Sequence, residues 1–524
     1  ATRVNASGNI EKETQNLFYQ SNDFSSAYWN YRAGDSSTGG QSGYDGTNDA
    51  WLLSVNSGGW AVYQNYIVTG VYTFSLYVKA GTIDVVQIDL FSSSTTYSGR
   101  FNLTSGTDAG GSNTIDRTIT DVGGGWYRVS LAANVSSTLY ARIGSVSVTG
   151  NFYIQDAQLE QGLVARDYIE TTTTAIYGGI TDNVPRLDYT DSSCPALLLE
   201  PSRSNKVPQS EYINSVDFST TPNVVFTNNY AESPEGVQNA TRVQFGATGS
   251  NQFFYDRATG NYGKKNTTSF YVKGTAGHTI DTYVDGNSST EGYYFFPKEI
   301  TLTGDWQRVE HTFDLPANAG SSNFVIRRQS SHTATEILIY GYQWEVDPAG
   351  GDASYATSYI PTYGSAVTRN NDVCRKENAT DLIGQTEGSF FMEFEMDLNN
   401  TIGTPVCISE YASTSNFLLV YQLQENSLSF RIRVNSVDQL NITSSTLSEG
   451  KHKFAFAYKE NNCVFYIDGV LIGTSTSNTI PSNLNRLSLV DVGSGINKVD
   501  SAVNQTLLFK TRLTNEELAA LTTI

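Results

Sequence analysis

The chain has 524 residues, of which 39% are hydrophobic and 12% aromatic, and this length and composition suffice for several buried cores. Acidic residues outnumber basic ones by 52 to 33, and the net charge of −19 argues against binding to nucleic acid or anionic lipid. A membrane-spanning helix would need about 18 consecutive apolar residues. No such run is present, so we expect no membrane insertion.

Residues 1–30 lack the basic and apolar regions of a signal peptide. Because Ala1 is not an initiator methionine, we expect the chain to be processed, renumbered or part of something longer. The apolar residues that follow are mostly Val, Ile, Tyr, Phe and Trp in short alternating runs, separated by turns rich in Gly, Ser, Thr and Asn. This pattern is typical of an all-β protein.

The segment "YTFSLYVKAG" predicts a half-buried strand, because Tyr72, Phe74, Leu76 and Val78 fall on one of its faces. The runs "WYRVSLAA" and "FYIQDAQLE" continue the same alternation. Several such strands, separated by Gly, Asn and Ser turns, predict a two-sheet β-sandwich of the jelly-roll type.

Much of this first unit occurs a second time. "YVKAGTIDVV" at residues 77–86 is matched by "YVKGTAGHTI" at 271–280, and "GGGWYRVSL" is matched by "TGDWQRVEH". Further pairs keep the same order along the chain, at offsets of 180 to 194 residues. Two homologous sandwiches in tandem are therefore predicted, over residues 1–180 and 181–370.

The segment after Tyr359 mixes Pro, Gly and polar residues and is typical of a linker. The strands that follow include "GKHKFAFAYKENNCVFYIDGVLIGT", in which "ENN" predicts a tight turn and Asp468-Gly469 suits a type I′ hairpin. The segment "TNEELAALT" predicts a short helix, with Thr514 as its cap and Glu517 three residues later. A third sandwich over residues 371–524, ending in this helix, is predicted.

The string "NVPRLDYTDSSCPALLLEPSRSNKVPQSE" at residues 183–211, followed by "SPEGVQNATRV", "SFYVKG", "DWQRVEHTF", "IYGYQWE" and "SYATSYIPTYGSAVTRNNDVC", resembles a module of phage tail-fibre and virion surface proteins, frequent in phages of Bacteroidetes. The resemblance implies a carbohydrate-binding-module-like β-sandwich. The first unit matches less closely, since it lacks "LLLEP" before Asn16 and has "ARDYIET" where the second has "ATSYIPT". Its opening, "ATRVNASGNIEKETQNLF", resembles the phrase that precedes such modules, which implies a larger fibre upstream.

The third unit is similar to concanavalin A-like (laminin G/pentraxin-like) sandwiches. Its "HKFAFAYKENNCVFYIDGVLIGT" hairpin and its final "RLTNEELAALTTI" carry this similarity. All three sandwiches thus belong, by resemblance, to classes that specify a fold more than a ligand.

Binding of a neutral glycan needs flat aromatic surfaces framed by hydrogen-bonding side chains and held by a rigid sandwich. Candidates lie beside Gly-rich turns at corresponding places in the two repeats, and in the segment "EGYYFF". They are Trp60, Tyr63, Tyr66, Phe254, Tyr255, Arg257, Tyr293 and Tyr294. For each of them, a core position on an alternating strand is the competing interpretation. Four other conspicuous residues are assigned to the core or to contacts between sheets: Trp126, Trp306, Gln343 and Glu345.

No catalytic constellation is evident. The four histidines form no HxH, HExxH or triad-like neighbourhood, no nucleophile elbow or phosphate loop occurs, and the many acids give no basis for choosing a pair. We therefore expect no enzyme and no organic cofactor. Loops rich in Asp and Asn, such as "DVGSG" at Asp491 in the third unit, offer oxygen ligands to Ca²⁺, although a solvated turn is the alternative.

The four cysteines are widely spaced and match neither a zinc site nor a dense disulfide framework. We expect mostly buried thiols, with a bridge between Cys407 and Cys463 as the alternative.

The leading hypothesis is a virion fibre protein, extracellular on the virion surface, that binds host cell-surface glycans. Duplication of a weak binding module raises avidity without new contacts. The resemblance implies contacts with other virion proteins and a homo-oligomer, commonly a trimer. The alternatives are a structural head or tail fibre spacer without receptor binding, and a secreted bacterial polysaccharide-binding adhesin or an accessory module of a polysaccharide-degrading enzyme.

Overall fold

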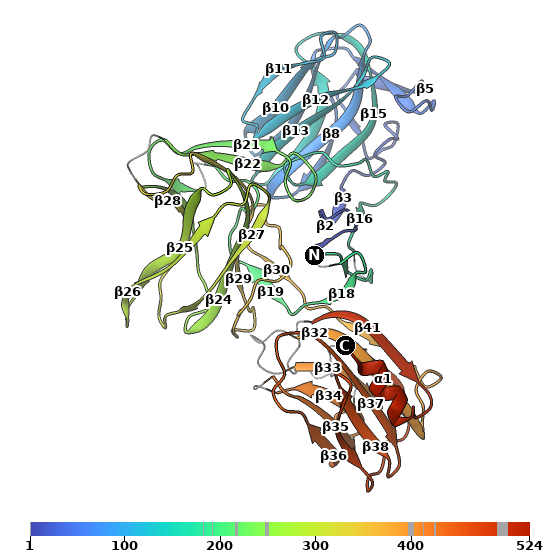
Figure 1. Cartoon of the computed structure of the whole chain (residues 1–524). Coiled ribbons are helices and arrows are strands. Elements are labelled where there is room, and N and C mark those ends of the chain that lie inside the picture. The colour runs from blue at the N-terminus through green and yellow to red at the C-terminus, as the bar shows by residue number, and fades with distance from the viewer. Residues whose placement is uncertain are drawn as a thin grey trace.

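The computed structural model describes residues 2–181, 183–190, 192–214, 218–246, 251–396, 403–411, 413–423, 426–489 and 501–524. Antiparallel β-sheet makes up nearly all the regular structure of these residues, and the helix α1 (Asn515–Thr522) is too short to cross a membrane. Three β-sandwiches, each with its own large apolar core, follow one another along the chain (Figure 1). The prediction of an all-β protein with tandem sandwiches and a short C-terminal helix is confirmed.

The first sandwich consists of two six-stranded sheets. One contains, in spatial order, β11 (Thr107–Ser112), β10 (Thr95–Asn102), β9 (Val85–Ser92), β14 (Thr138–Ser145), β7 (Gly59–Ile67) and β4 (Asn30–Tyr31). The other contains β12 (Asp116–Gly123), β13 (Trp126–Val135), β8 (Gly70–Ala80), β15 (Gly150–Gln161), β6 (Ala50–Val55) and β5 (Ser36–Gln41). As the alternation predicts, Tyr72, Phe74, Leu76 and Val78 of β8 all belong to the core between the sheets.

The second sandwich repeats this plan. Its first sheet contains β21 (Val225–Ala231), β22 (Ala240–Gln244), β29 (Glu336–Val346), β19 (Arg203–Asn205) and β30 (Val367–Arg369), and β29 also pairs with β24 (Lys264–Lys273), which pairs with β27 (Gln307–Leu315). Its second sheet contains β20 (Ser219–Thr220), β23 (Gln252–Ala258), β28 (Ser322–Arg328), β25 (Thr279–Ser288) and β26 (Gly292–Thr301). The order β26-β25-β28-β23 corresponds to β10-β9-β14-β7 of the first sandwich.

The third sandwich has a seven-stranded and a six-stranded sheet. The larger contains β17 (Leu187–Asp188), β18 (Ala196–Leu199), β41 (Ser501–Phe509), β32 (Glu387–Met396), β37 (Gly450–Lys459), β38 (Cys463–Ile467) and β39 (Val470–Ser475). The smaller contains β31 (Cys374–Lys376), β40 (Arg486–Leu489), β33 (Gly403–Ser409), β34 (Phe417–Gln422), β35 (Leu428–Val434) and β36 (Val437–Thr443).

Local signals in the third sandwich are confirmed in detail. The hairpin between β38 and β39 turns at Asp468 and Gly469 with φ of 48° and 79°, the positive values that a type I′ turn requires. At the start of α1, the hydroxyl of Thr514 accepts from the amide of Glu517, and the Glu517 carboxylate accepts from the amide of Thr514. This reciprocal pair is the predicted capping box.

All four cysteines are free thiols. The prediction of buried thiols is right for Cys407 and Cys463, whereas Cys374 is half-buried. It is wrong for Cys194, which lies exposed because it sits in the connection between β17 and β18.

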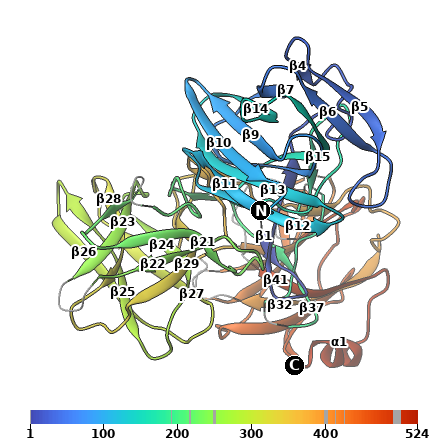
Figure 2. The ribbon, with the colours of Figure 1, turned by 90° about the horizontal axis from the view of Figure 1, so that it is seen from above.

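Two short hairpins each lead into one sandwich but pack against the next sandwich along the chain. The hairpin of β1 (Thr2–Val4) and β2 (Ile10–Lys12) leads into the first sandwich through β3 (Thr14–Asn16), which pairs with β16 (Ile176–Gly178). It packs on the second sandwich, however, where Ile10 contacts the apolar cluster of Tyr340 and Tyr359. Likewise β17-β18 leads into the second sandwich but pairs with β41 of the third. Figures 1 and 2 place the N-terminal hairpin in the middle of the molecule, among the three sandwiches.

A buried cluster of charged side chains joins the first two sandwiches, and we call it the Glu235 cluster. The Nζ atom of Lys12 lies 2.7 Å from a carboxylate oxygen of Glu211 and 2.5 Å from one of Glu235. Arg166 holds the second oxygen of Glu235 at 2.5 Å. Burial by itself would raise the pKa of Glu235, but Lys12 and Arg166 lower it to about 2. The hydroxyls of three tyrosines donate to Glu211: Tyr340, Tyr359 and Tyr363.

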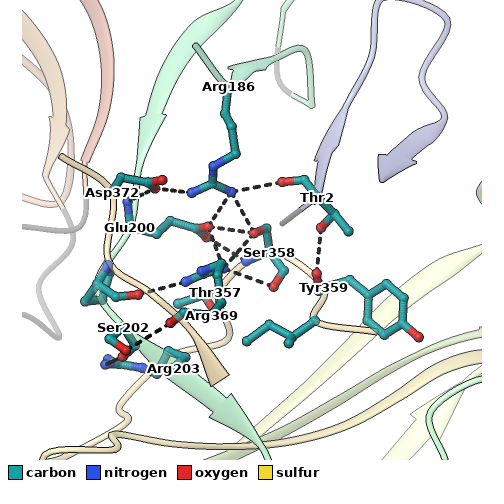
Figure 3. Close-up of polar contacts among 12 residues, drawn as sticks. Thr2, Arg186, Glu200, Ser202, Arg203, Thr357, Ser358, Tyr359, Arg369 and Asp372 are labelled. Atoms are coloured by element: carbon teal, nitrogen blue, oxygen red, sulfur yellow. Dashed lines mark hydrogen bonds and ion pairs between the residues drawn. The ribbon is translucent and has the colours of Figure 1, made fainter. Parts of the chain in front are cut away.

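A second buried cluster, the Glu200 cluster, joins the second sandwich to its neighbours (Figure 3). Glu200 directly follows β18, and one of its carboxylate oxygens lies 2.8 Å from Arg186 and 2.7 Å from Arg369. Arg186 also pairs with Asp372 and donates to the carbonyl of Thr2 at 2.9 Å. Burial would raise the pKa of Glu200, but the two guanidinium groups lower it to about 2. The cluster thereby ties the N-terminal hairpin to the segments that enter and leave the second sandwich.

Glu200→Gln should destabilise the chain by about 3 to 5 kcal/mol at neutral pH, because it leaves two buried guanidinium groups without a full counter-charge. The pKa of Glu200 lies near 2 in the folded chain, against an ordinary value of 4.5. A lowered pKa stabilises the fold above the unfolded value, and this contribution is lost as the pH falls from about 5 toward 2. Melting followed by circular dichroism from pH 7 to pH 2 should therefore show a shallower pH dependence for Glu200→Gln than for the wild type.

The matched control is Glu387→Gln, which breaks the more exposed pair of Glu387 with Lys459. It should cost less than about 1 kcal/mol. Equal melting temperatures and equal pH profiles for the two variants would contradict the role assigned to the Glu200 cluster.

Candidate functional site

The outer surface of the sheet β10-β9-β14-β7 carries a cluster of aromatic and charged side chains, which we call the first face. Leu90 on β9 and Ile143 on β14 point into the core. The residues next to them along each strand, Asp89 and Arg142 among them, therefore point outward. Arg142 of β14 lies opposite Tyr63 of β7 on one side and Asp89 of β9 on the other. The first face is made of Trp60, Tyr63, Asp89, Phe91, Tyr140 and Arg142.

The rings of the first face form a continuous half-buried surface around one guanidinium group. The ring centroids of Trp60 and Tyr63 are 5.3 Å apart, those of Tyr63 and Tyr140 5.5 Å, and those of Tyr140 and Phe91 6.0 Å. The guanidinium carbon of Arg142 lies 3.9 Å from the centroid of Phe91 and 5.6 Å from those of Trp60 and Tyr140. Such spacings are favourable for aromatic pairs and for cation–π contacts.

The second sandwich carries a corresponding second face on β26-β25-β28-β23. Arg327 of β28 lies opposite Phe253 of β23 and Asp281 of β25, just as Arg142 lies opposite Tyr63 and Asp89. Two residues before Arg327, Val325 lies opposite Tyr283, which is the counterpart of Phe91. The second face is made of Phe253, Tyr255, Asp281, Tyr283, Tyr293, Phe295 and Arg327.

The second face is the more open of the two. Phe295 is 40% exposed and Tyr293 62% exposed, whereas Tyr283 is buried, with its ring centroid 4.9 Å from that of Phe295. Arg327 lies 4.7 Å from the Tyr283 centroid and binds Asp281 through two nitrogens, with Nε to Oδ1 at 3.0 Å. The register of the two sheets therefore produces the same trio of aromatic ring, Arg and Asp twice.

Burial shapes the charge of the first face. It raises the pKa of Asp89 even though hydrogen bonds from Gln87 and the nearby Arg142 act to lower it. Burial also lowers the pKa of Arg142, against the attraction of Asp89. Both shifts follow from the aromatic surroundings, which exclude water from the pair.

Five of the eight residues proposed from the sequence lie on or beside these faces. Trp60 and Tyr63 belong to the first face, Tyr255 and Tyr293 to the second, and Arg257 lies next to Tyr255, with its guanidinium carbon 5.9 Å from that ring centroid.

The other three point inward, because strand alternation places them on the core side. Phe254 is wholly buried, and Tyr66 packs with its ring centroid 5.8 Å from that of buried Phe18. The hydroxyl of Tyr294 bonds that of Ser322 inside the sandwich at 2.5 Å. Phe254 and Tyr294 are thereby removed from the surface that a ligand can reach, and Tyr66 is half-buried against the core.

Sequence reasoning missed Asp89, Phe91, Tyr140 and Arg142 on the first face, and Phe253, Asp281, Tyr283, Phe295 and Arg327 on the second. In "VVQIDLF", Gln87, Asp89 and Phe91 alternate with apolar residues, and this pattern marks an outward surface. The pairing of that strand with β14 and β7, which brings Arg142 and Tyr63 beside it, has no local signal.

The polar residues that the sequence assigned to the core lie there. Gln343 and Glu345 are buried, and the side-chain oxygen of Gln343 accepts from the amide of Ile360 at 2.7 Å. Gln158 of the first repeat accepts from the amide of Ile169 at 2.8 Å in the same way. These side chains fasten the segment after β15 to β15, and the segment after β29 to β29.

Two carboxylates share one cation in the Glu235 cluster. Glu211 and Glu235 both contact Lys12, and neither side chain is exposed to solvent. Among the described residues, no group of three or more His, Cys, Asp and Glu side chains is placed to hold a metal ion. The loop at Asp491, proposed as a Ca²⁺ site, lies outside the described residues.

No family model matches the chain, and no curated protein matches it. Among solved structures, the tandem CBM22 domain of Paenibacillus barcinonensis Xyn10C is 11% identical, with a TM-score of 0.22, over 63% of this chain and 96% of that one. The CBM40 of Ruminococcus gnavus IT-sialidase is 12% identical, with a TM-score of 0.25, over 27% and 85%. The enzymatically active domain of bacteriophage CBA120 tailspike protein 4 is 13% identical, with a TM-score of 0.23, over 27% and only 21%. Likeness at this level is no guide to what this chain binds.

Arg142→Met should raise the pKa of Asp89 further, because Arg142 favours the carboxylate more than any other cation does. A titration of aspartate carboxyl carbons by NMR measures this shift. The control is Arg117→Met, which removes the partner of Asp108 elsewhere in the same sandwich and should raise the pKa of Asp108 while leaving Asp89 unchanged. An Asp89 titration that is the same in both variants would show that the first face is not assembled as described.

Proposed function

We propose that this chain is a non-enzymatic fibre protein of a phage virion whose tandem sandwiches bind glycans on the host surface. The observation that carries the proposal is the recurrence of the same aromatic, arginine and aspartate positions on two outer faces. Packing explains why core residues recur in a duplicated sandwich, because the fold requires them. It does not require rings and a charged pair on the surface that points away from the core.

The chemistry of the two faces suits a sugar. A pyranose ring has an apolar side that can lie on an aromatic ring, and its hydroxyls can bond the guanidinium and carboxylate groups beside it. Trp60, Tyr63 and Phe295 supply the aromatic surface, and both faces are open sheets rather than enclosed pockets. An open face accommodates an extended chain of sugars such as a cell-surface polysaccharide.

Two weak sites on one rigid body bind a repeating ligand more strongly than either alone, by about 10² to 10⁴ when both can engage. The Glu235 cluster holds the two sandwiches together through buried ion pairs, so the distance between the faces is fixed. The proposed placement on a virion fibre, with other virion proteins and further copies of the chain as partners, rests on the sequence resemblance.

A structural spacer is the second candidate function. The two buried clusters favour it, because they would stiffen a projecting fibre whether or not a ligand binds. Removing the outer rings should abolish binding to host cells if the chain binds glycans, and should change nothing measurable if it is a spacer.

Trp60→Ala and Phe295→Ala should each weaken binding to host cells and to a glycan array by at least about tenfold, since each removes a principal ring of its face. The double variant should lose nearly all binding, because avidity requires both faces. Fluorescently labelled full chain is the probe, with and without EDTA to detect a metal requirement.

Tyr177→Ala is the matched control, because Tyr177 on β16 is 51% exposed but belongs to neither face. It should bind like the wild type. Binding by the double variant at the wild-type level, or a folded wild-type chain that binds no cell and no glycan, would favour the spacer.

A further inference from the structure

The two faces have an arginine and an aspartate at corresponding strand positions. They differ in whether the arginine forms an ion pair with that aspartate. We infer that the first face binds a sugar that carries a carboxylate, through the guanidinium of Arg142, whereas the second face binds an uncharged sugar. The inference rests on the proposed function and assigns a different ligand class to each repeat.

Arg142 has its donors available. Within the ranges that the structure describes, its guanidinium makes no hydrogen bond or ion pair with another residue, and its contacts are with the ring faces of Phe91, Trp60 and Tyr140. The neighbouring Asp89 carboxylate instead accepts from the side-chain Nε2 of Gln87, at 2.9 and 3.0 Å. Arg142 therefore lies opposite Asp89 without an ion pair to it, and its donors remain open to a ligand.

Arg327 is in the opposite state. Its Nε and Nη2 both donate to Asp281, and the same carboxylate accepts from the side chain of Gln329 at 2.7 Å. The next acid on the strand, Asp285, accepts from Tyr293 at 3.0 Å and from Asn323 at 2.8 Å. The charged groups of the second face therefore satisfy one another.

The remaining charges reinforce this contrast. Beside the first face, the exposed Arg100 on β10 donates to the uncharged side chain of Gln87 at 3.0 Å, and Arg32 is paired with Asp35. Beside the second face, Glu299 lies opposite Asp281, and Arg257 bonds Asn323, which lies opposite Asp285. With these neighbours the first face has three basic groups (Arg142, Arg100, Arg32) and two acidic ones (Asp89, Asp35), whereas the second has two basic groups (Arg327, Arg257) and three acidic ones (Asp281, Asp285, Glu299). A carboxylate is attracted to the first and repelled by the second.

The guanidinium fork matches a carboxylate in geometry as well as charge. Its parallel N–H groups can bond both carboxylate oxygens, and such charge-assisted pairs are roughly twice as strong as neutral ones. The surrounding rings exclude water and strengthen the pair. Hexuronic acids and sialic acids both carry a ring-attached carboxylate next to an apolar ring side, so both present the chemistry that Arg142 and its rings recognise.

Calorimetric titration of the full chain tests the inference. The acidic probes are tetragalacturonic acid and 3′-sialyllactose, and their uncharged counterparts are the tetragalacturonate methyl ester and lactose. At least one acid should bind about ten- to a hundredfold more tightly than its counterpart. Which acid does so distinguishes a uronate ligand from a sialate ligand.

Arg142→Met should abolish the preference for the acid, because it removes the charge-assisted pair and therefore weakens binding of the acid far more than binding of the uncharged counterpart. Arg142→Lys keeps the charge but loses the fork and should restore only part of the preference. Lys79→Gln is the charge-matched control, because Lys79 on β8 belongs to the other sheet of the same sandwich. It should keep the full preference.

The outcomes separate the inference from the proposed function. Equal affinity for acids and uncharged counterparts, or an acid preference that survives in Arg142→Met, overturns the inference while glycan binding stands. Failure of both acids to bind, when uncharged glycans bind on the array through Trp60 and Phe295, does the same. A chain that binds no glycan at all overturns both.

Discussion

Buried ion pairs hold the three sandwiches of this chain against one another. Taking a carboxylate out of water is costly, and only close cations and hydrogen bonds repay that cost. Glu235 meets Lys12 and Arg166, which belong to the first sandwich and its leading hairpin, and Glu200 meets Arg186 and Arg369 from either side of the second. Removing any one partner leaves a buried charge without its full counter-charge, so these ion pairs stabilise the contacts between the sandwiches.

The backbone reinforces these joints. The amide of Val71 in the first sandwich donates to the carbonyl of Tyr363 at 2.9 Å, and a β-carbon on Gly70 would lie 1.9 Å from the same oxygen. Only glycine permits this approach, and its φ of 112° also disfavours any other residue. Together with the hairpins that pack beyond the sandwich they precede, such contacts set the separation between the two outer faces.

Much of the fold was predictable because its signals are local. Alternation identified the strands, the Asp468-Gly469 pair identified a hairpin turn, and Thr514 with Glu517 identified the helix start. The duplication followed from strings that keep their order. The partners of Lys12 and Glu211 were not predictable, because a charged residue near a chain end or a turn normally lies in water, and nothing local indicates that 199 positions later the chain supplies its counter-ion. The candidate site was only half predictable for the same reason. Aromatic content suggested Trp60 and Tyr63, but the cross-strand register that adds Arg142 and Asp89 is a property of the whole sheet.

The proposed function places the ligand on the outer faces of the first two sandwiches. A crystal structure of the full chain, with an oligosaccharide to which it binds on the array, tests this placement. The sugar ring should lie on Trp60 and Tyr63 within hydrogen-bond distance of Arg142, or on Phe295 beside Arg327, or on both. A sugar bound in the loops or on the third sandwich, with both faces empty, would contradict it.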